Sequence, residues 1–327
     1  MTIVPDIDAR GGHHCETTAL GVLLRHEGLD LSEPMLFGLG SGLSFVYWDS
    51  RNQPFPFLGG RVKPYALTVN LAARLGLTLR TEETTSAGRA WRNVAGPIDA
   101  GRPVGLQLDC YHLEYFGTRT HFGGHVVAMY GYDEHEAYLV DTAQQGGAVR
   151  TSLASLALAR AERGPMTARN RSFTLAVPGD APRWQERLVP AIRACAEAFL
   201  APPIANLGHR GIEKAAGLLP GWLARAERPG RDLALAADLM ERAGTGGGLF
   251  RALYRDFLGE CAGLIDAAAL RTGHRLYGEA AVLWAEVAAL VAKAGESGDA
   301  APLQQAGAVL HDLTRLEREA MRALSGL

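Results

Sequence analysis

Three residues of the chain have the types that catalysis by a thiol requires: Cys15, His125 and Asp141. A thiol attacks an ester or amide carbonyl as the thiolate, and a neighbouring imidazole keeps it ionised as an ion pair. A carboxylate then fixes the imidazole tautomer and stabilises its positive form. The sequence therefore predicts a Cys–His–Asp site in which Cys15 is the nucleophile, His125 the base and Asp141 the orienting group.

Cys15 stands where a helix is expected to begin. The residues after it place Ala19, Leu20, Leu23 and Leu24 on one apolar helical face, and Gly28 follows in the position that favours a helix end. At a helix N-terminus the macrodipole and the free N–H groups favour a thiolate. A buried structural cysteine can also begin a helix, so this position alone leaves both roles open.

His125 and Asp141 belong to a predicted β-hairpin. Residues 124–132 read as one strand, 133–135 as the turn, and 137–141 as its antiparallel partner. The hairpin predicts that a histidine at the start of one strand and an aspartate at the end of the next lie close together.

The register of this hairpin decides whether the two side chains meet. If a three-residue turn pairs Tyr132 with Glu136, then Val127 lies opposite Asp141. His125 is then a diagonal neighbour of Asp141 on the same face, within hydrogen-bonding reach. A slip of one residue would put the two side chains on opposite faces of the sheet.

The two halves of the chain differ in sequence pattern. The length of 327 residues also favours two domains. Residues 1–178 mix strand-like runs, glycine-rich turns and a few helices, whereas residues 183–327 have apolar residues at helical spacing. A breaker cluster, Pro178–Pro182, separates them. We therefore expect an α+β domain over 1–178 and an all-α domain over 183–327. The expected helices of the second half are 184–200, 208–227, 231–243, 248–273, 275–294 and 300–325.

Composition narrows the class of protein. The formal net charge of −2 and the mixed signs along the chain disfavour nucleic-acid binding. The four cysteines contain no C-x-x-C pair, which favours reduced thiols over disulfides or a structural zinc site. The first ten residues do not have the pattern of a signal peptide, and no apolar stretch is long enough to span a membrane. We expect a cytoplasmic protein with no membrane partner.

Several motifs of the chain lie at 14–15, 33–45, 101–104, 109–115, 121–125, 138–142 and 244–251, with Tyr254. Together they resemble the butirosin biosynthesis protein H family, and the resemblance covers nearly the whole chain. It implies a papain-like fold related to bacteriocin-processing cysteine peptidases, in which the cysteine begins a central helix and the histidine and aspartate lie on the sheet. In the named member it implies transfer of an aminoacyl group from an acyl carrier protein thioester to an aminoglycoside amine. The active-site positions that match are Cys15, His125 and Asp141.

The chain departs from papain-type enzymes before its cysteine. Those enzymes place a glutamine there to build the oxyanion hole, and residues 8–14 contain none. The hole must combine the Cys15 N–H with another donor, for which we consider His14, His13 and, more weakly, Gln107 on a predicted strand. Loss of one such donor costs roughly 3 kcal/mol of transition-state stabilisation.

Other polar groups could bind substrate. Asp109 and Glu114, beside Tyr111 and Tyr115, could hold a cationic acceptor amine or serve as structural groups. His121 is a further candidate near His125. Because Gly123 and Gly124 separate these two histidines and no helix carries them, we expect no metal site.

Two glycine-rich segments suggest phosphate binding only weakly. No strand precedes Gly38–Gly42 and no Lys-Ser/Thr pair follows, so a tight turn lining the acyl channel near Cys15 fits better. Gly244–Gly248 precedes a predicted helix and could bind a pantetheine phosphate, or could be an interhelix turn. We expect no cofactor apart from a phosphopantetheine thioester carried by a substrate.

The sequence thus favours a cysteine-dependent acyltransferase. Its expected partners are an acyl carrier protein or another thioester donor and a small-molecule acceptor, and a homo-oligomeric state stays open. The first alternative is a hydrolase or cyclase that uses the same acyl-enzyme, as a peptidase, a thioesterase or a catalyst of ring closure. The second alternative is a binding protein without catalysis.

Overall fold

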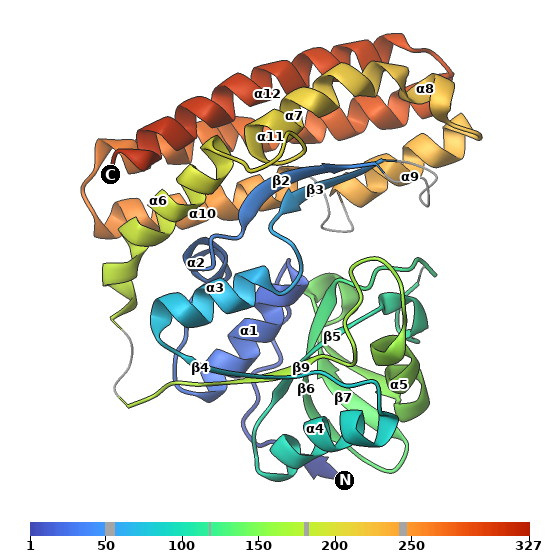
Figure 1. Ribbon diagram of the computed structural model, residues 1–327, viewed down its shortest axis with the longest axis vertical. Coiled ribbons are helices and arrows are strands. Elements are labelled where there is room, and N and C mark those ends of the chain that lie inside the picture. Colours follow the sequence, from blue (N-terminus) through green and yellow to red (C-terminus); the bar gives the residue numbers. More distant parts are fainter. Residues whose placement is uncertain (50–55, 118, 180–182, 242–246) are drawn as a thin grey trace. The chain divides into compact units, whose positions relative to one another are not determined.

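The chain folds into two compact units (Figure 1). The computed structural model describes residues 1–49, 56–117, 119–179, 183–241 and 247–327. The first unit contains 1–36 and 63–184, and the second contains 37–62 and 185–327. The expected division into 1–178 and 183–327 is therefore wrong for one segment, because 37–62 packs with the helices of the second unit. Most of the expected linker, Asp180–Pro182, lies outside the described residues.

The first unit is built on an antiparallel sheet. Its strand order is β4-β9-β5-β6-β7-β8, and β1 pairs with one end of β6. The expected strands of the hairpin are confirmed as β6 and β7. The strands are β1 (Thr2–Ile3), β4 (Thr78–Glu82), β5 (Val104–Leu108), β6 (His125–Tyr132), β7 (Glu136–Val140), β8 (Ala148–Ser152) and β9 (Ser172–Ala176).

Helices cover this sheet. Helix α1 (Cys15–His26) contacts β5, β6, β7 and β9, and its buried residues run from Cys15 to Leu24. Helices α4 (Ala87–Asp99) and α5 (Leu153–Ala161) complete a separate apolar core that includes Leu106, Val127, Met129 and Leu139. Helix α3 (Ala66–Leu75) lies beside α1. The expected α+β arrangement, with the cysteine-bearing helix on an antiparallel sheet, is confirmed.

The hairpin between β6 and β7 reaches the expected register by a different route. Tyr132 pairs with Ala137 rather than with Glu136, because the connection has four residues and not three. A bulge between Met129 and Gly131 then shifts the pairing by one residue, so that Ala128 lies opposite Val140. One step further along the strands, Val127 faces Asp141, as predicted.

The second unit consists of helices and one two-stranded hairpin. Helix α2 (Glu33–Leu39) leads from the first unit into it. The hairpin is β2 (Leu43–Trp48) with β3 (Phe57–Arg61). The helices are α6 (Leu188–Leu200), α7 (Gly208–Leu218), α8 (Trp222–Arg225), α9 (Pro229–Glu241), α10 (Gly247–Leu264), α11 (Ala268–Ser297) and α12 (Ala301–Ser325).

The β2–β3 hairpin joins the second unit through its aromatic side chains and its backbone. The ring of Phe45 packs against Trp284 of α11 with 5.3 Å between ring centroids and a tilt of 31°. The backbone N–H of Tyr47 donates to the carbonyl of Asn206, before α7. Because these partners lie more than 150 residues away in the sequence, local pattern could not assign the hairpin to the helices.

Two expected helix boundaries are wrong for physical reasons. The break expected near residue 274 occurs at 265–267, and α11 runs through Gly273. A Cβ at Gly273 would lie 2.9 Å from a Leu324 methyl carbon, so this glycine permits close helix packing rather than ending a helix. The helix expected over 208–227 is interrupted at Leu219–Gly221, which form a 3-10 turn containing Pro220.

The turn expected at Gly38–Gly42 follows α2. The N–H groups of Ser41 and Gly42 donate to the carbonyls of Gly38 and Phe37. A Cβ at Gly38 would lie 2.2 Å from the ring of Phe257, so this glycine allows an aromatic ring of α10 to approach.

Within the described residues, no helix is long and apolar enough to cross a membrane.

A buried ion pair fills the centre of the helical unit. Arg251 donates through Nε and Nη2 to the carboxylate of Glu317, at 3.0 Å each, and both side chains are 0% exposed. The indole N–H of Trp284 donates to the same carboxylate at 2.7 Å. The third arginine contact is made by Nη1, which donates to the carbonyl of Gly60 in β3 at 3.2 Å. The pair therefore holds α10, α11, α12 and the hairpin together.

Candidate active site

Two glycines before Cys15 bring its segment against the segment that follows Asp141. A Cβ at Gly11 would lie 2.4 Å from the backbone nitrogen of Ala143, and the N–H of Ala143 donates to the carbonyl of Gly12 at 2.8 Å. No side chain larger than hydrogen fits at Gly11 without displacing this backbone. The glycines thus allow the start of α1 to lie beside the end of β7, which carries Asp141.

A carboxylate from α2 holds the entry to α1. Glu33 accepts hydrogen bonds from the backbone N–H groups of His13 and His14 at 2.8–3.0 Å, and from the hydroxyl of Thr17 at 2.9 Å. The negative carboxylate lies at the positive end of the helix, which is the favourable arrangement for the macrodipole. Glu33 therefore orients the residues just before Cys15, a role that sequence reasoning missed.

A second carboxylate, next to the cysteine, was also missed. Glu16 is 0% exposed and accepts the N–H groups of Tyr65 and Thr68 and the hydroxyl of Thr68, at 3.3, 3.0 and 2.8 Å. These donors belong to the start of α3, so Glu16 caps α3 and fixes α1 against it. A glutamate directly after a candidate nucleophile, on a face otherwise apolar, was the signal available in the sequence.

His125 and Asp141 form the contact that the hairpin register predicts. The Nε2 atom of His125 lies 2.8 Å from Oδ2 of Asp141, and the two residues are 7% and 0% exposed. Asp141 also accepts the hydroxyl of Tyr115 on Oδ2 at 2.8 Å and the backbone N–H of Thr142 on Oδ1 at 2.6 Å. Three donors therefore satisfy and immobilise one buried carboxylate.

These contacts set the charge state of the carboxylate. Burial acts to raise the pKa of Asp141, but the positive charge and hydrogen bond of His125, with the donors from Thr142 and Tyr115, lower it below its usual value. Asp141 is therefore ionised throughout the neutral range and can stabilise an imidazolium.

The structure brings Cys15 to the same imidazole. Burial acts to lower the pKa of His125, but the charge of Asp141, then that of Cys15, and hydrogen bonds to both raise it well above the usual value. Because Asp141 occupies Nε2, Nδ1 is the ring nitrogen that faces the thiol. The edge of the imidazole also packs against the ring of Phe116, at 5.2 Å and 86°. The three predicted residues thus meet around one protonatable ring.

Gln107 is not available as an oxyanion donor. Its amide nitrogen donates to the carbonyls of Gly123 and Met166 at 3.1 and 2.7 Å, and its oxygen accepts from Arg171 at 2.6 Å. Both N–H donors are therefore already used in joining β5 to neighbouring loops. The expectation that Gln107 could complete the hole is wrong.

The histidines before the cysteine differ in environment. His13 has an exposed side chain, whereas His14 is 3% exposed and its Nδ1 lies 3.2 Å from the hydroxyl of Thr17. The backbone N–H groups of both histidines donate hydrogen bonds to Glu33. A second oxyanion donor from this segment would have to be a side chain, and the His14 ring is the buried one.

The acidic and aromatic candidates around residue 110 are mainly structural. Asp109 is 3% exposed and accepts the N–H groups of Tyr111 and Phe122, and Nδ1 of His121 lies 3.3 Å from it. His121 stacks on Tyr111 with 4.0 Å between ring centroids. Asp109 is thus committed to its own loop. His121 does not join the His125–Asp141 pair.

Glu114 is likewise engaged: its carboxylate accepts the N–H and hydroxyl of Ser152 at 2.8 and 2.9 Å. Among the described residues no group of three or more His, Cys, Asp or Glu side chains is arranged to hold a metal ion. The part of Gly244–Gly248 that could bind a phosphate lies largely outside the described residues.

We expect iodoacetamide to alkylate Cys15 first. Burial, with smaller effects of neighbouring charges, raises the pKa of Cys110 to about 11, and burial with the charge of Glu260 raises that of Cys261 to about 12. At pH 7.5 a thiol with a pKa of 11 is ionised to roughly one part in 10³–10⁴, and only the thiolate reacts. The fourth thiol, Cys195, is 1% exposed and points at the carbonyl of Leu43.

Peptide mapping after brief labelling at pH 7.5 measures this order, and Cys15→Ser provides the matched control. We expect labelling of the native chain to fall at least about tenfold in that variant, since thiolate fraction sets the rate. Faster labelling of Cys110 than of Cys15 in the folded protein would contradict an activated Cys15.

Tyr115→Phe should shift the pH dependence of His125. The phenol donates to Oδ2 of Asp141, the same oxygen that His125 contacts. Without this donor the carboxylate is more basic and stabilises the imidazolium more strongly, so the pKa of His125 rises further. The alkaline limb of the pH profile of Cys15 alkylation therefore moves to higher pH. A purely structural tyrosine would lower the rate at every pH without moving the limb. Rates from pH 6 to 10 in both proteins distinguish the two cases.

The geometry defines a class. A cysteine that begins the central helix, with a histidine and an aspartate on the antiparallel sheet in the chain order Cys, His, Asp, is the arrangement of papain-like cysteine enzymes. Residues 14–142 match the family described as butirosin biosynthesis protein H, N-terminal, and residues 154–324 match the domain of unknown function DUF4872. The chain belongs to the family of proteins that carry the DUF4872 domain, and its N-terminal domain is similar to that of butirosin biosynthesis protein H.

The comparison with solved structures finds a C39-like protein from Bacillus anthracis, assigned provisionally as a peptidase. It is 16% identical, with a TM-score of 0.40, and the match covers 55% of this chain and 98% of that one. At this level of similarity the match does not bear on activity, which must be argued from the site. Comparison with curated proteins gives no match.

Proposed function

We propose that the protein is a cysteine-dependent acyltransferase of secondary metabolism. It takes an acyl or aminoacyl group from a thioester onto Cys15 and passes it to an amine or a similar nucleophile. The observation that carries this proposal is the buried His125–Asp141 pair, whose imidazole also interacts with Cys15. Similarity of the N-terminal domain to that of butirosin biosynthesis protein H supports the thioester donor, for which a carrier protein with a phosphopantetheine arm is the natural form.

In the first half-reaction the Cys15 thiolate attacks the thioester carbonyl. A tetrahedral intermediate forms and collapses with cleavage of the bond to the donor sulfur, and the His125 imidazolium protonates the departing thiolate. The acyl group is now on Cys15 and His125 is neutral. Asp141 holds the ring by Nε2 throughout, so Nδ1 faces the reacting sulfur.

In the second half-reaction an acceptor amine attacks the acyl–Cys15 thioester. Neutral His125 takes the proton that the amine loses, and collapse of the intermediate forms the amide and releases the Cys15 thiolate. The imidazolium–thiolate pair is restored without any oxidant or cofactor. Water in place of the amine would give hydrolysis, and a nucleophile within the acyl group would give a ring.

The developing oxyanion needs donors at the start of α1. The backbone N–H groups of His13 and His14 are already held by Glu33, which leaves the Cys15 N–H as the backbone donor nearest the reacting sulfur. We propose the buried His14 ring as the second donor. Its role would be to donate to the oxyanion, since the papain-type glutamine is absent and Gln107 is committed elsewhere.

Intact-mass spectrometry of the full chain tests the function. Incubation with small acyl thioesters, such as N-acetylcysteamine derivatives, should add one acyl group to the wild type and none to Cys15→Ala. Addition of an amine panel that includes aminoglycosides should discharge the acyl group faster than buffer alone and form an amide. Discharge at one rate with and without every amine, giving only the free acid, would make the protein a hydrolase. Absence of a Cys15-dependent acyl-enzyme with any thioester would contradict catalysis by this site.

A further inference from the structure

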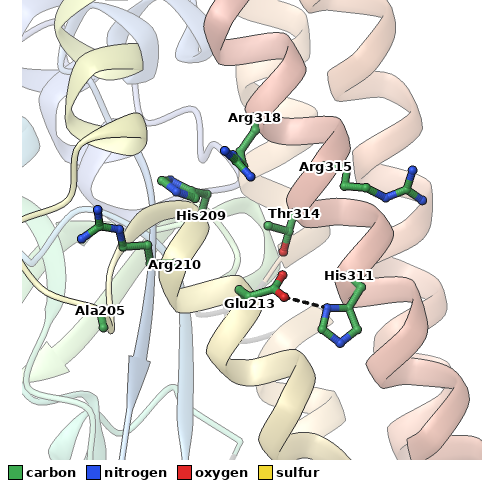
Figure 2. Close-up of a pocket in the computed structure, with 8 residues that line it drawn as sticks. All are labelled: Ala205, His209, Arg210, Glu213, His311, Thr314, Arg315 and Arg318. Carbon is green, nitrogen blue, oxygen red and sulfur yellow. Dashed lines mark ion pairs between the residues drawn. The ribbon is translucent and has the colours of Figure 1, made fainter.

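The helical unit contains a cavity of about 540 Å³ along the seam between α7 and α12 (Figure 2). Its size lies in the range of small-molecule sites, roughly 300–1,000 Å³. It is lined by Ala205, His209, Arg210, Glu213, His311, Thr314, Arg315 and Arg318. All of these residues belong to the second unit, so the cavity is a feature of that unit alone.

The lining is unusually cationic for a cavity in a helical bundle. It holds three arginines and two histidines against one carboxylate, Glu213. That carboxylate is already paired with His311, at 3.1 Å, and Arg315 is paired with Asp312 on its own helix. Among the residues that the structure describes, Arg210 and Arg318 have no carboxylate partner. The cavity therefore has an excess of positive charge that the protein does not neutralise.

Arg318 gives the clearest sign of a missing acceptor. Its Nε atom is buried and has no hydrogen-bond partner among the described residues. A buried charged donor is normally paired, because its lost hydration is otherwise not replaced. In Figure 2 Arg318 and Thr314 face the gap between α7 and α12, whereas Arg210 extends away from α12 and Arg315 points to the outer side of α12. Nδ1 of His209 lies 3.0 Å from the carbonyl oxygen of Phe199. An anion in the gap would meet the unpaired guanidinium directly.

The first turn of α7 adds to the positive potential. Helix α7 begins at Gly208, so His209 and Arg210 occupy its first turn, which contains no acidic residue. Cations at the positive end of a helix dipole are unfavourable, and an anion bound beside them removes the repulsion. The helix and its side chains thus favour the same kind of ligand.

We propose that this cavity binds a phosphate-bearing small molecule. Guanidinium groups donate in a planar fork that matches phosphate oxygens, and Arg318 presents such a fork to the gap, while Arg210 adds positive charge to the lining. The volume exceeds that of one phosphate, so the ligand carries an organic part along the seam between the helices. This role is separate from the chemistry at Cys15 and assigns a ligand class to a domain without a known one.

Isothermal titration of the full-length protein with inorganic phosphate, at an ionic strength held constant with sodium chloride, tests the core of the site. We expect saturable binding at one site, with an affinity that falls at least tenfold in Arg318→Gln and about threefold in Arg210→Gln, which removes one positive charge from the lining. The matched control is Arg322→Gln, an exposed arginine one turn further along α12 and outside the cavity, which should leave the affinity unchanged. Because Arg210 is exposed, its variant should fold even if Arg318→Gln does not.

The result that overturns the proposal is equally specific. Phosphate binding that is absent at constant ionic strength would show that the unpaired arginines form no phosphate site. A loss of affinity in Arg322→Gln equal to that in Arg210→Gln would show diffuse attraction by the basic surface of α12 rather than a site in the cavity.

Discussion

His125→Ala should abolish the acylation of Cys15 by a small thioester. The structure places the imidazole against both the thiol and the buried carboxylate, so its loss removes the ion pair and the proton donor to the leaving thiol. A general acid–base residue contributes about 10²–10⁴-fold to a rate, and here one ring serves both half-reactions. We expect single-turnover acylation, read by intact mass, to slow by at least about 10³-fold.

The matched control is His135→Ala, a histidine exposed in the turn of the same hairpin. It should acylate at the wild-type rate, and both variants should keep the wild-type circular dichroism. If His125→Ala acylates as the wild type does, His125 is not the base. His121 lies four residues before His125 in the chain, and His121→Ala would then show whether it takes that role.

Asp141→Asn should have a smaller effect with a characteristic pH signature. The amide can still hold the imidazole but removes the negative charge that raises the pKa of His125. The pKa of His125 therefore falls, and the alkaline limb of the rate moves to lower pH, opposite to the direction expected for Tyr115→Phe. We expect a loss well below the ~10⁴-fold of the same change in a serine triad, because the Cys15 charge also stabilises the imidazolium. An unmoved limb in both variants would contradict electrostatic coupling to His125.

Sequence reasoning selected the three candidate groups that the structure brings together, because chemistry limits the residue types. The chain has few sets of a thiol, an imidazole and a carboxylate that a helix start and a hairpin could bring together. Strand alternation then places His125 and Asp141 on one face of the sheet. It missed Glu16 and Glu33, whose hydrogen-bond donors lie at the starts of other helices. Their partners depend on how α1, α2 and α3 pack, and no local pattern reports that packing.

The register of the hairpin was predicted correctly at the site for an incomplete reason. The turn is one residue longer than expected, and the bulge at Tyr130 compensates for the extra residue. The alternation of side chains along a strand cannot reveal a longer turn and a bulge whose effects on the register cancel. The burial of His125 and Asp141, rather than the turn, therefore fixes the register of β6 and β7 at the end of the strands.

The division of the chain was harder to predict than its elements. Residues 37–62 precede most of the catalytic sheet, yet β2 and β3 pack on α7, α10 and the Arg251–Glu317 pair. Composition changes near residue 180, and sequence reasoning places one boundary there. Residues 37–62, which pack with a unit that lies later in the chain, show no such change in composition, because their apolar side chains suit either core.

Glu317→Leu should be among the most destabilising single changes in the helical unit. Its carboxylate accepts from Arg251 and from Trp284, and its removal leaves a fully buried guanidinium charge without a counterion. Breaking a buried ion pair by removing one partner costs about 3–5 kcal/mol. The surface pair of Arg275 and Glu279, with side chains 59% and 49% exposed, provides the contrast. Glu279→Gln should change the free energy of unfolding by at most about 0.5 kcal/mol.

The double variant Arg251→Met/Glu317→Leu separates charge from packing. Removal of both charges should recover part of the loss, because an apolar pair can replace a buried ion pair at little net cost. Recovery should stop about 1–3 kcal/mol short, since the buried Trp284 N–H keeps no acceptor. Urea unfolding followed by tryptophan fluorescence measures all four proteins. A double variant no more stable than Glu317→Leu would show that the arginine is not penalised by its unpaired charge, and that its packing on Trp284 and its bond to Gly60 hold the unit together instead.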